Sequence, residues 1–223
     1  MQVARKLTVI LPTLNEAGGL PLVMAALAKA GAKDVVVIDG GSTDGTVDIA
    51  KRLGALVMMQ DGRGKGMAFR TFLSKYPVDD DASYVMLDAD ASYDGREVGL
   101  LAEALEHAEV VTGSRPPLVF DARSLMHYIG GYLISVFASV MFLRWNPDIT
   151  SGYWGFRGYA LKKMAITSAG FELEANFFAQ AAKKRLKAVC VPITYAKRVG
   201  KAKLSFVDAL KIVPKLLEER VSG

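Results

Sequence analysis

Short apolar runs alternate with longer amphipathic segments through the first half of the chain. Runs rich in branched apolar residues predict buried strands at residues 7–11, 35–38, 55–59, 84–87 and 109–112. Helical patterns separate these strands at residues 17–30, 46–53, 66–75 and 96–107. This alternation is typical of βαβ units, so we expect an α/β fold with a mainly parallel sheet flanked by helices.

The second half of the chain is less regular. Residues 148–157 are expected to form a loop that leads into a strand. A helix at 172–185 and a strand at 188–193 follow, and a basic loop occupies residues 197–203. No internal repeat or linker interrupts the pattern, so the sequence predicts a single domain over residues 1–223.

The chain ends with a predicted amphipathic helix at residues 204–221. Its apolar stripe comprises Val207, Leu210, Val213 and Leu217. Pro214 lies within this segment and is expected to bend or interrupt the helix, because proline lacks the N–H that an interior helical position donates.

The composition is that of a globular protein with a modest basic excess. Of 223 residues, 51% are hydrophobic and 23% are charged, which argues against a disordered chain. The net charge of +5 suits an anionic partner such as a phosphate, a membrane surface or nucleic acid, and equally a basic surface without such a partner. The single cysteine, Cys190, excludes an internal disulfide framework and fits a reducing compartment.

Two carboxylates, Asp88 and Asp90, follow the predicted strand at 84–87 with only Ala89 between them. Ligands of parallel sheets bind beyond the carboxyl ends of the strands. Because close carboxylates repel each other and are costly to desolvate, a bound cation explains the pair. Mg²⁺ or Mn²⁺ takes one or two protein carboxylates and completes its shell with water and phosphate. A turn closed by an Asp side chain is the alternative interpretation.

The order of the polar motifs resembles that of family 2 glycosyltransferases of the GT-A fold, most closely the branch of dolichyl-phosphate mannose synthases and polyprenyl-phosphate glycosyltransferases. The resemblance covers nearly the whole chain. The matching pieces are PTLNE (12–16), DGGSTDGT (39–46), GRGKGMA (62–68), LDADASYD (87–94), TGSR (112–115), DITSGYWGFR (148–157), GFELE (170–174) and PITYAKRVGKAKLS (192–205). It implies a GT-A fold, Mg²⁺ or Mn²⁺ held by Asp88 and Asp90, and a nucleotide-sugar donor.

The resemblance also implies which residues bind the nucleotide sugar. They are Pro12, Leu14, Glu16, Asp39, Lys65, Gly66, Asp88, Ala89, Asp90 and Arg198. Asp90 and Arg115 are expected to be catalytic, since the metal held by Asp90 and the positive charge of Arg115 would stabilise the leaving diphosphate. Asp44, by contrast, is expected to close a turn or to cap the following helix.

A second set of residues is implied to meet the phosphate of the acceptor. It comprises Arg115, Arg123, His127, Arg198 and Lys203. A planar guanidinium suits bidentate contact with phosphate, although runs of Lys and Arg often form only a solvated surface. His127 stands where close relatives carry a serine, and two roles fit it equally: phosphate binding, or that of an interior histidine.

The chain departs from the family pattern in ways that concern the sugar and the acceptor. Ser92 stands where the family commonly has Gln, and Gly40 where a second Asp often follows the first. The Glu-Asp pair with which relatives deprotonate hydroxyl acceptors is absent from DITSGYWGFR. Because a phosphate acceptor is already an anion and needs no base, this absence favours a lipid phosphate.

The segment Leu125–Leu143 contains no Asp, Glu, Lys or Arg. It could span a membrane, be buried in the protein, or lie along a bilayer surface. A span would carry residues 148–157 to the far side, away from Asp88. The resemblance implies a helix at the membrane surface, and Arg123 and Arg144 flank the segment, so we expect peripheral association with the cytoplasmic face of a membrane.

These observations favour an inverting transferase that moves a hexose from GDP-mannose or a UDP-sugar to a polyprenyl phosphate such as dolichyl phosphate. No nucleic-acid partner is expected, and the oligomeric state is not set by the sequence. The alternatives are a transferase with another acceptor, a sugar-phosphate nucleotidyltransferase, and a binding protein with a decayed site. A nucleotidyltransferase would be expected to show G-x-G-x-R-L near the first strand, where PTLNE stands instead.

Overall fold

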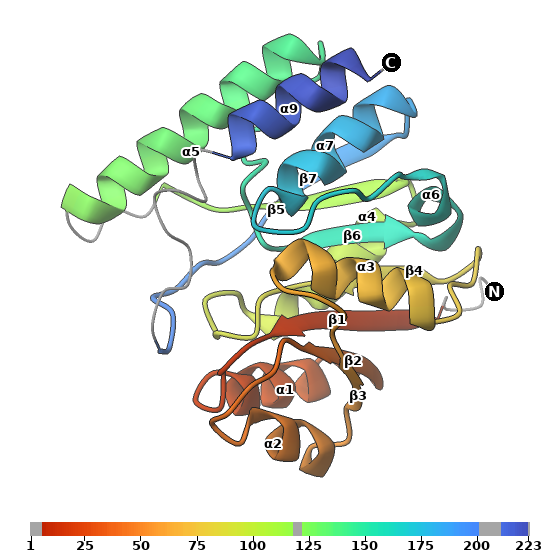
Figure 1. Ribbon diagram of the computed structural model, residues 1–223, viewed down its shortest axis with the longest axis vertical. Coiled ribbons are helices and arrows are strands. Elements are labelled where there is room, and N and C mark those ends of the chain that lie inside the picture. Colours follow the sequence, from red (N-terminus) through yellow and green to blue (C-terminus); the bar gives the residue numbers. More distant parts are fainter. Residues whose placement is uncertain (1–5, 118–121, 201–210, 223) are drawn as a thin grey trace.

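The structure is a computed structural model that describes residues 6–117, 122–200 and 211–222, with the backbone alone for residues 122–127 (Figure 1). Its centre is a seven-stranded sheet in the order β3-β2-β1-β4-β6-β5-β7. The strands are β1 (Leu7–Thr13), β2 (Asp34–Asp39), β3 (Leu56–Met59), β4 (Ser83–Met86), β5 (Val110–Ser114), β6 (Trp154–Arg157) and β7 (Ala188–Pro192).

The sheet is mainly parallel, as the alternating pattern predicted. Strands β3, β2, β1 and β4 pair in parallel, and so do β5 and β7. Strand β6 is the exception, because it runs antiparallel to both β4 and β5 and so joins the two parallel groups. The five strands predicted in the first half are all present, and the expected strand after residue 148 is β6.

Helices cover both faces of the sheet, as its apolar strands require. Along β1 the side chains alternate: Ile10 packs into one core, and Val9 and Leu11 pack into the other. The helical elements are α1 (Leu20–Lys29), α2 (Thr46–Arg52), α3 (Lys65–Lys75), the 3₁₀ turn η1 (Gly95–Glu97), α4 (Val98–Ala104), α5 (Ala122–Met141), α6 (Gly158–Lys163), α7 (Leu173–Lys183) and α9 (Ile212–Val221).

The long helix α5 covers most of the charge-free segment and runs through Gly130 and Gly131. It lies beside α9 at the end of the molecule that also carries α7 (Figure 1). Within the described part of the chain, none of the helices combines the length and the apolar character that crossing a bilayer requires.

Helix α9 packs against α7 and α5 through a face other than the predicted apolar stripe. Leu217 is 48% exposed, whereas Ile212, Leu216, Lys215 and Glu219 are buried. Pro214 lies in the first turn of α9, where no intrahelical N–H bond is lost. Val207 and Leu210 lie outside the described residues.

Glu219 joins α9 to α7 through a buried hydrogen-bond network. Asn176 Nδ2 donates to Glu219 Oε1 at 2.8 Å, and Gln180 Nε2 donates to Oε2 at 2.6 Å. Lys215 Nζ lies 3.1 Å from Oε1, and the Glu219 side chain is only 4% exposed. Because buried polar groups must be paired, this network fixes how α9 sits on α7.

We therefore expect Glu219→Ala to lower the free energy of unfolding by about 3 kcal/mol, because it leaves a buried ammonium and two buried amides without their shared acceptor. Chemical denaturation measures the change. The control is Glu218→Ala, whose side chain is 65% exposed, and which should cost less than about 0.5 kcal/mol. Equal effects of the two substitutions would contradict the role assigned to the network.

Candidate active site

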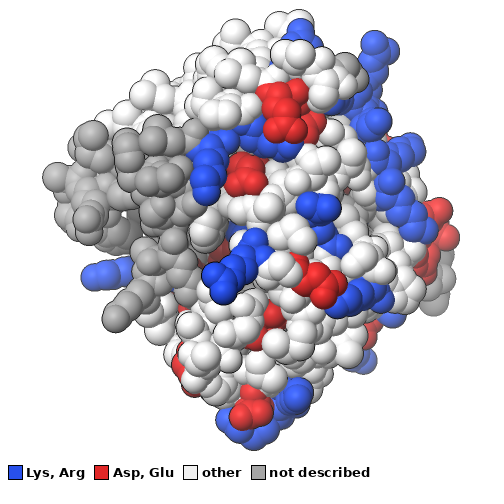
Figure 2. All heavy atoms as spheres, viewed as in Figure 1, with Lys and Arg blue, Asp and Glu red and all other residues white. Residues whose placement is uncertain are grey.

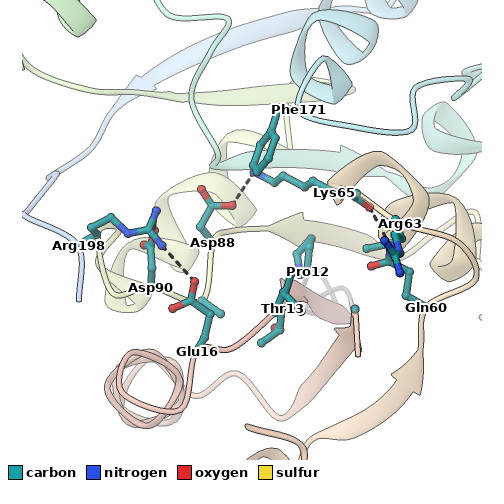
Figure 3. A pocket seen from close by; sticks show the side chains of 15 residues that line it. Pro12, Thr13, Glu16, Gln60, Arg63, Lys65, Asp88, Asp90, Phe171 and Arg198 are labelled. Carbon is teal, nitrogen blue, oxygen red and sulfur yellow. Dashed lines mark hydrogen bonds and ion pairs between the residues drawn. The ribbon is translucent and has the colours of Figure 1, made fainter. Parts of the chain in front are cut away.

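A cavity of about 490 Å³ opens where β1, β2, β3 and β4 end. This is the edge at which ligands of parallel sheets bind. Its walls come from the residues that follow these four strands, from the start of α3, and from two loops of the second half (Figure 3). The lining residues are Pro12, Thr13, Leu14, Glu16, Gly40, Gln60, Arg63, Gly64, Lys65, Ala68, Asp88, Ala89, Asp90, Phe171 and Arg198.

Lys65, the first residue of α3, lies between two carboxylates. Its Nζ is 2.5 Å from Asp88 Oδ1 and 2.6 Å from Glu174 Oε1. Lys65 and Glu174 are each only 9% exposed, whereas Asp88 is 31% exposed. Burial alone would lower the pKa of Lys65, but the two adjacent carboxylates raise that pKa well above its ordinary value. The ammonium is therefore a fixed positive charge at the cavity wall.

Asp90 pairs with a second basic side chain, that of Arg198, which lies far along the chain from it. Arg198 NH1 lies 3.3 Å from Asp90 Oδ2, and Arg198 NH2 lies 3.2 Å from Glu16 Oε1 (Figure 3). The other oxygen of Asp90, Oδ1, accepts from the backbone N–H of Ser92 at 2.9 Å and from its hydroxyl at 2.5 Å. Asp90 thus closes a turn, as the alternative interpretation of the motif predicted, and it also pairs with Arg198. The metal site stays a prediction.

The turn after Asp90 has an unusual backbone. Ala91 has φ = 61°, in the left-handed region that alanine rarely adopts. Such a conformation costs roughly 1–3 kcal/mol and persists only where the surroundings impose it. Here the backbone N–H of Val199 donates to the carbonyl of Asp90 at 2.8 Å, so the segment that carries Arg198 also holds this turn.

The start of α3, directly after Lys65, is held by residues 168–170. Gly66 N donates to Gly170 O at 3.0 Å, and Met67 N donates to Ala169 O at 2.9 Å. The approach is so close that a Cβ on Gly66 would lie 2.4 Å from Ser168 O. Glycine at residue 66 is thus explained by contact with another segment of the backbone.

The donor atoms at the cavity fit a divalent cation that is shared with a ligand. Among the described residues no group of three or more His, Cys, Asp or Glu side chains could hold a metal ion by itself. Asp88 and Asp90 offer carboxylate oxygens, and Mg²⁺ needs only one or two of these when phosphate oxygens complete its shell. Gly152 leaves room for Asp88, since a Cβ there would lie 2.4 Å from Asp88 Oδ2.

Asp39 ends β2 beside the cavity without being among its lining residues. Its Oδ2 accepts from the N–H groups of Gly41 and Ser42 at 2.9 and 2.8 Å. Its Oδ1 is buried and has no hydrogen-bond partner among the described residues. Asp44 has the turn role expected for it: its Oδ1 accepts from the N–H of Thr46, the first residue of α2, at 3.1 Å.

Arg115 lies outside the cavity lining and is bound to Asp148 by two parallel hydrogen bonds. Its Nε donates to Oδ2 and its NH2 to Oδ1, both at 2.7 Å. The guanidinium also lies 5.3 Å from the ring centre of Tyr195. The bonds to Asp148 engage Nε and NH2 of the guanidinium, and the catalytic role of Arg115 stays a prediction.

Three residues predicted to meet the acceptor phosphate cannot be placed. Lys203 and the side chains of Arg123 and His127 lie outside the described part of the chain. Of the predicted donor-site residues, Gly66 is buried behind the cavity wall rather than lining it.

Several cavity residues received no role from the sequence, among them Gln60, Arg63 and Phe171. Glu174 was also missed, although it contacts Lys65 directly. One signal could have revealed it: Glu174 shares the segment FELEANFF with four large apolar side chains, and a charge that is buried among such side chains requires a partner. The partner itself could not be read from the sequence.

The net charge is not gathered into one continuous patch on the face seen in Figure 2. Lys and Arg side chains are interspersed there with Asp and Glu side chains. The basic excess therefore gives little information about the partner, and the charges inside the cavity give more.

Comparison with known proteins agrees with this geometry. Residues 8–164 match the family described as Glycosyl transferase family 2. The chain belongs to this family. It is 34% identical over 193 residues to Glycosyltransferase AglJ of Haloferax volcanii, which covers 85% of this chain and 63% of that protein. It is 32% identical over 223 residues to Undecaprenyl-phosphate mannosyltransferase of Micrococcus luteus, which covers 90% of this chain and 88% of the relative.

Low-salt glycan biosynthesis hexosyltransferase Agl6 of Haloferax volcanii is 32% identical, and the chain spans 53% of its length. Among solved structures, glucosyl-3-phosphoglycerate synthase from Mycobacterium tuberculosis, in complex with Mn²⁺, UDP and phosphoglyceric acid, superposes with a TM-score of 0.78 at 19% identity. The match covers 97% of this chain and 79% of that one. This likeness establishes the GT-A fold.

Gly66→Ala tests the contact between α3 and residues 168–170. The new Cβ would meet the backbone of Ser168, so we expect a loss of stability of about 2 kcal/mol or more and weaker binding of nucleoside diphosphate. The control is Gly99→Ala in α4, where nothing lies within 4 Å and the substitution should stabilise the helix by roughly 0.5–1 kcal/mol. Thermal unfolding and GDP or UDP titration measure both effects, and unchanged behaviour of Gly66→Ala would contradict the contact.

Proposed function

We propose that this protein is an inverting, metal-dependent hexosyltransferase that uses a nucleoside diphosphate sugar, either GDP-mannose or a UDP-sugar, and a polyprenyl phosphate such as dolichyl phosphate. The observation that carries the proposal is the cavity at the strand ends, where Asp88 and Asp90 lie with Lys65 and Arg198. Carboxylates that could share a cation with a diphosphate, next to cations that could pair with it directly, suit a donor of this kind.

Mg²⁺ or Mn²⁺ held by Asp88 and Asp90 would supply Lewis-acid stabilisation of the leaving diphosphate. This chain's own part is to fix those carboxylates and to add charge. Lys65 and Arg198 offset part of the negative charge of the site before the donor binds, and each could then turn part of its hydrogen bonding toward phosphate oxygens. The strand-end residues, from Pro12 to Glu16 and at Gly40, would line the nucleoside.

The transfer itself would be a single displacement. An oxygen of the acceptor phosphate forms the bond to the anomeric carbon while the bond to the diphosphate breaks, so the configuration inverts and the nucleoside diphosphate leaves. A phosphate acceptor arrives ionised and needs no general base. Arg115, Arg123, His127, Arg198 and Lys203 remain the proposed acceptor contacts.

A lipid acceptor is supported by the names of two relatives, Undecaprenyl-phosphate mannosyltransferase and Polyprenol monophosphomannose synthase. The side-chain distribution on α5 supports it independently. Ile134 and Met141 of α5 pack against the core, but other large apolar side chains of this helix face outward, with Leu133 60% and Val140 69% exposed. The small polar side chains face inward: Ser135 Oγ accepts from Ile149 N at 3.0 Å, and Ser139 Oγ accepts from Asn146 N at 3.1 Å.

The exposed apolar face extends along the helix and just beyond it. The other large apolar residues that are more than one-third exposed are Tyr128, Ile129, Tyr132, Phe137, Leu143 and Trp145. A contiguous apolar surface of this kind typically marks a membrane or protein contact. We propose that it lies on the cytoplasmic face of a membrane, where it would bring the acceptor lipid to the enzyme.

The proposal is tested by supplying purified protein with GDP-mannose and with UDP-sugars, together with dolichyl phosphate or undecaprenyl phosphate and Mn²⁺ or Mg²⁺. Separation of the lipid products should show a glycosyl phospholipid from one donor. Asp88→Asn or Asp90→Asn should lower transfer by roughly 100-fold or more, since each substitution removes the charge of a proposed metal ligand. Lipid products at the wild-type rate in both variants would exclude the metal assignment. No lipid product from any donor would refute the lipid acceptor.

Membrane contact by α5 is tested with vesicles of phosphatidylcholine and phosphatidylglycerol. The double variant Leu133→Glu/Val140→Glu should reduce vesicle binding by about tenfold or more, because it removes two apolar anchors and adds two like charges to an anionic surface. Leu100→Glu on α4 is the control, since Leu100 is 45% exposed, and it should bind as wild type does. If the double variant instead converts an oligomer to a monomer and leaves vesicle binding unchanged, the apolar face is a protein interface.

A further inference from the structure

Glu174 is a buried acid whose position can be explained by the chemistry of the cavity. It lies in the first turn of α7, and Lys65 is the first residue of α3. We infer that Glu174 is a positioning residue of the donor site, which acts through Lys65 on Asp88 and on the divalent cation that Asp88 would bind. This inference rests on the metal site of the proposed function.

The charges explain why Asp88 alone would not hold Lys65. The ammonium lies 2.5 Å from Asp88, in contact with an oxygen of the carboxylate that would also face the cation. When a divalent cation binds Asp88, it competes with the ammonium for the same negative charge and repels it at short range. An ammonium that is 9% exposed cannot gain enough water to replace a lost counter-charge.

Glu174 supplies a second counter-charge that the cation does not use. Its Oε1 is 2.6 Å from Lys65 Nζ, on a side chain that is itself 9% exposed. The group of Lys65, Asp88 and Glu174 carries a net charge of about −1 rather than zero, which favours the arrival of a cation. An ammonium has three N–H donors, so two carboxylates leave one for an oxygen of a bound diphosphate.

The backbone fixes the distance between Glu174 and Lys65. The starts of α3 and α7 are tied by the hydrogen bonds from Gly66 N to Gly170 O and from Met67 N to Ala169 O. Within the loop, Glu172 Oε1 accepts from the N–H groups of Ala169 and Gly170, both at 2.9 Å. Neither helix start can move without breaking these bonds, so Glu174 is a rigid support for the ammonium.

The inference is tested on the full chain by titrating Mn²⁺ in the presence of GDP and, separately, of UDP, with free Mn²⁺ measured by electron paramagnetic resonance. Glu174→Gln keeps the shape of the side chain and removes its charge. It should weaken Mn²⁺ binding roughly 10- to 100-fold, as is usual for the loss of a group that orients a metal ligand. Glu174→Asp keeps the charge at a greater distance, and its loss of affinity should be intermediate. Glu218→Gln, which alters an exposed partner of Lys215 on α9, is the control and should bind as wild type does.

A double-mutant cycle with Lys65→Met separates action through Lys65 from a general effect on the fold. In the Lys65→Met background, Glu174→Gln should change Mn²⁺ affinity by less than about twofold, because the group through which it acts is gone. Wild-type affinity in Glu174→Gln, or independent effects that multiply in the double variant, would overturn the inference. If circular dichroism shows that Glu174→Gln does not fold, Glu174→Asp decides, and wild-type affinity in that variant overturns it. A wild-type chain that binds no Mn²⁺ with either nucleotide would instead refute the metal site of the proposed function, and this inference with it.

Discussion

Acidic side chains gathered at one end of a parallel sheet repel one another, and the organisation of this cavity follows from how that repulsion is offset. Asp88 and Asp90 leave the same strand, and Glu16 comes from the neighbouring one. Cationic side chains from other parts of the chain offset part of this repulsion. Lys65 meets Asp88, and Arg198 meets both Asp90 and Glu16. A donor diphosphate with its metal would exchange these ion pairs for new ones rather than create charge in an empty cavity.

Helix α7 connects these ion pairs to the rest of the molecule. Its first turn carries Glu174, which holds Lys65, and its next two turns carry Asn176 and Gln180, which hold Glu219 of α9. Helix α9 in turn lies beside α5. The same short helix therefore contacts the donor site at one end and supports the apolar end of the molecule along its length. Helix α7 would in this way be one rigid support for both the proposed donor site and the proposed membrane-facing helix α5, without a separate moving element.

Helix α5 shows why apolar content alone does not settle the place of a helix. Its inward face carries Ser135, Ala138 and Ser139, whose small side chains allow close packing. The hydroxyls of the two serines accept hydrogen bonds from backbone N–H groups of the following loop. Its outward face carries Leu133 and Val140, whose side chains are mostly exposed. The hydrophobic effect disfavours so large an exposed apolar face in a helix surrounded by water. A helix turned this way is suited to an apolar partner, and the lipid acceptor proposed for this chain is one.

Local pattern was enough to predict much of this protein. Alternating apolar runs predicted β1 to β5 and the parallel arrangement, because residues close together in the chain form each strand, and the order of the motifs along the chain identified the family. The sequence also pointed to Asp88 and Asp90, since two carboxylates after a buried strand are costly without a partner. The folded structure was needed to show which cationic side chain meets which carboxylate, that Arg115 is bound to Asp148, and that Glu174 lies beside the cavity. It also decided that α9 is attached by Glu219 and Lys215 rather than by Leu217. The physical reason is that ion pairs and buried hydrogen bonds join residues far apart in sequence, at distances that depend on how helices and loops pack, and no periodicity along the chain records those distances.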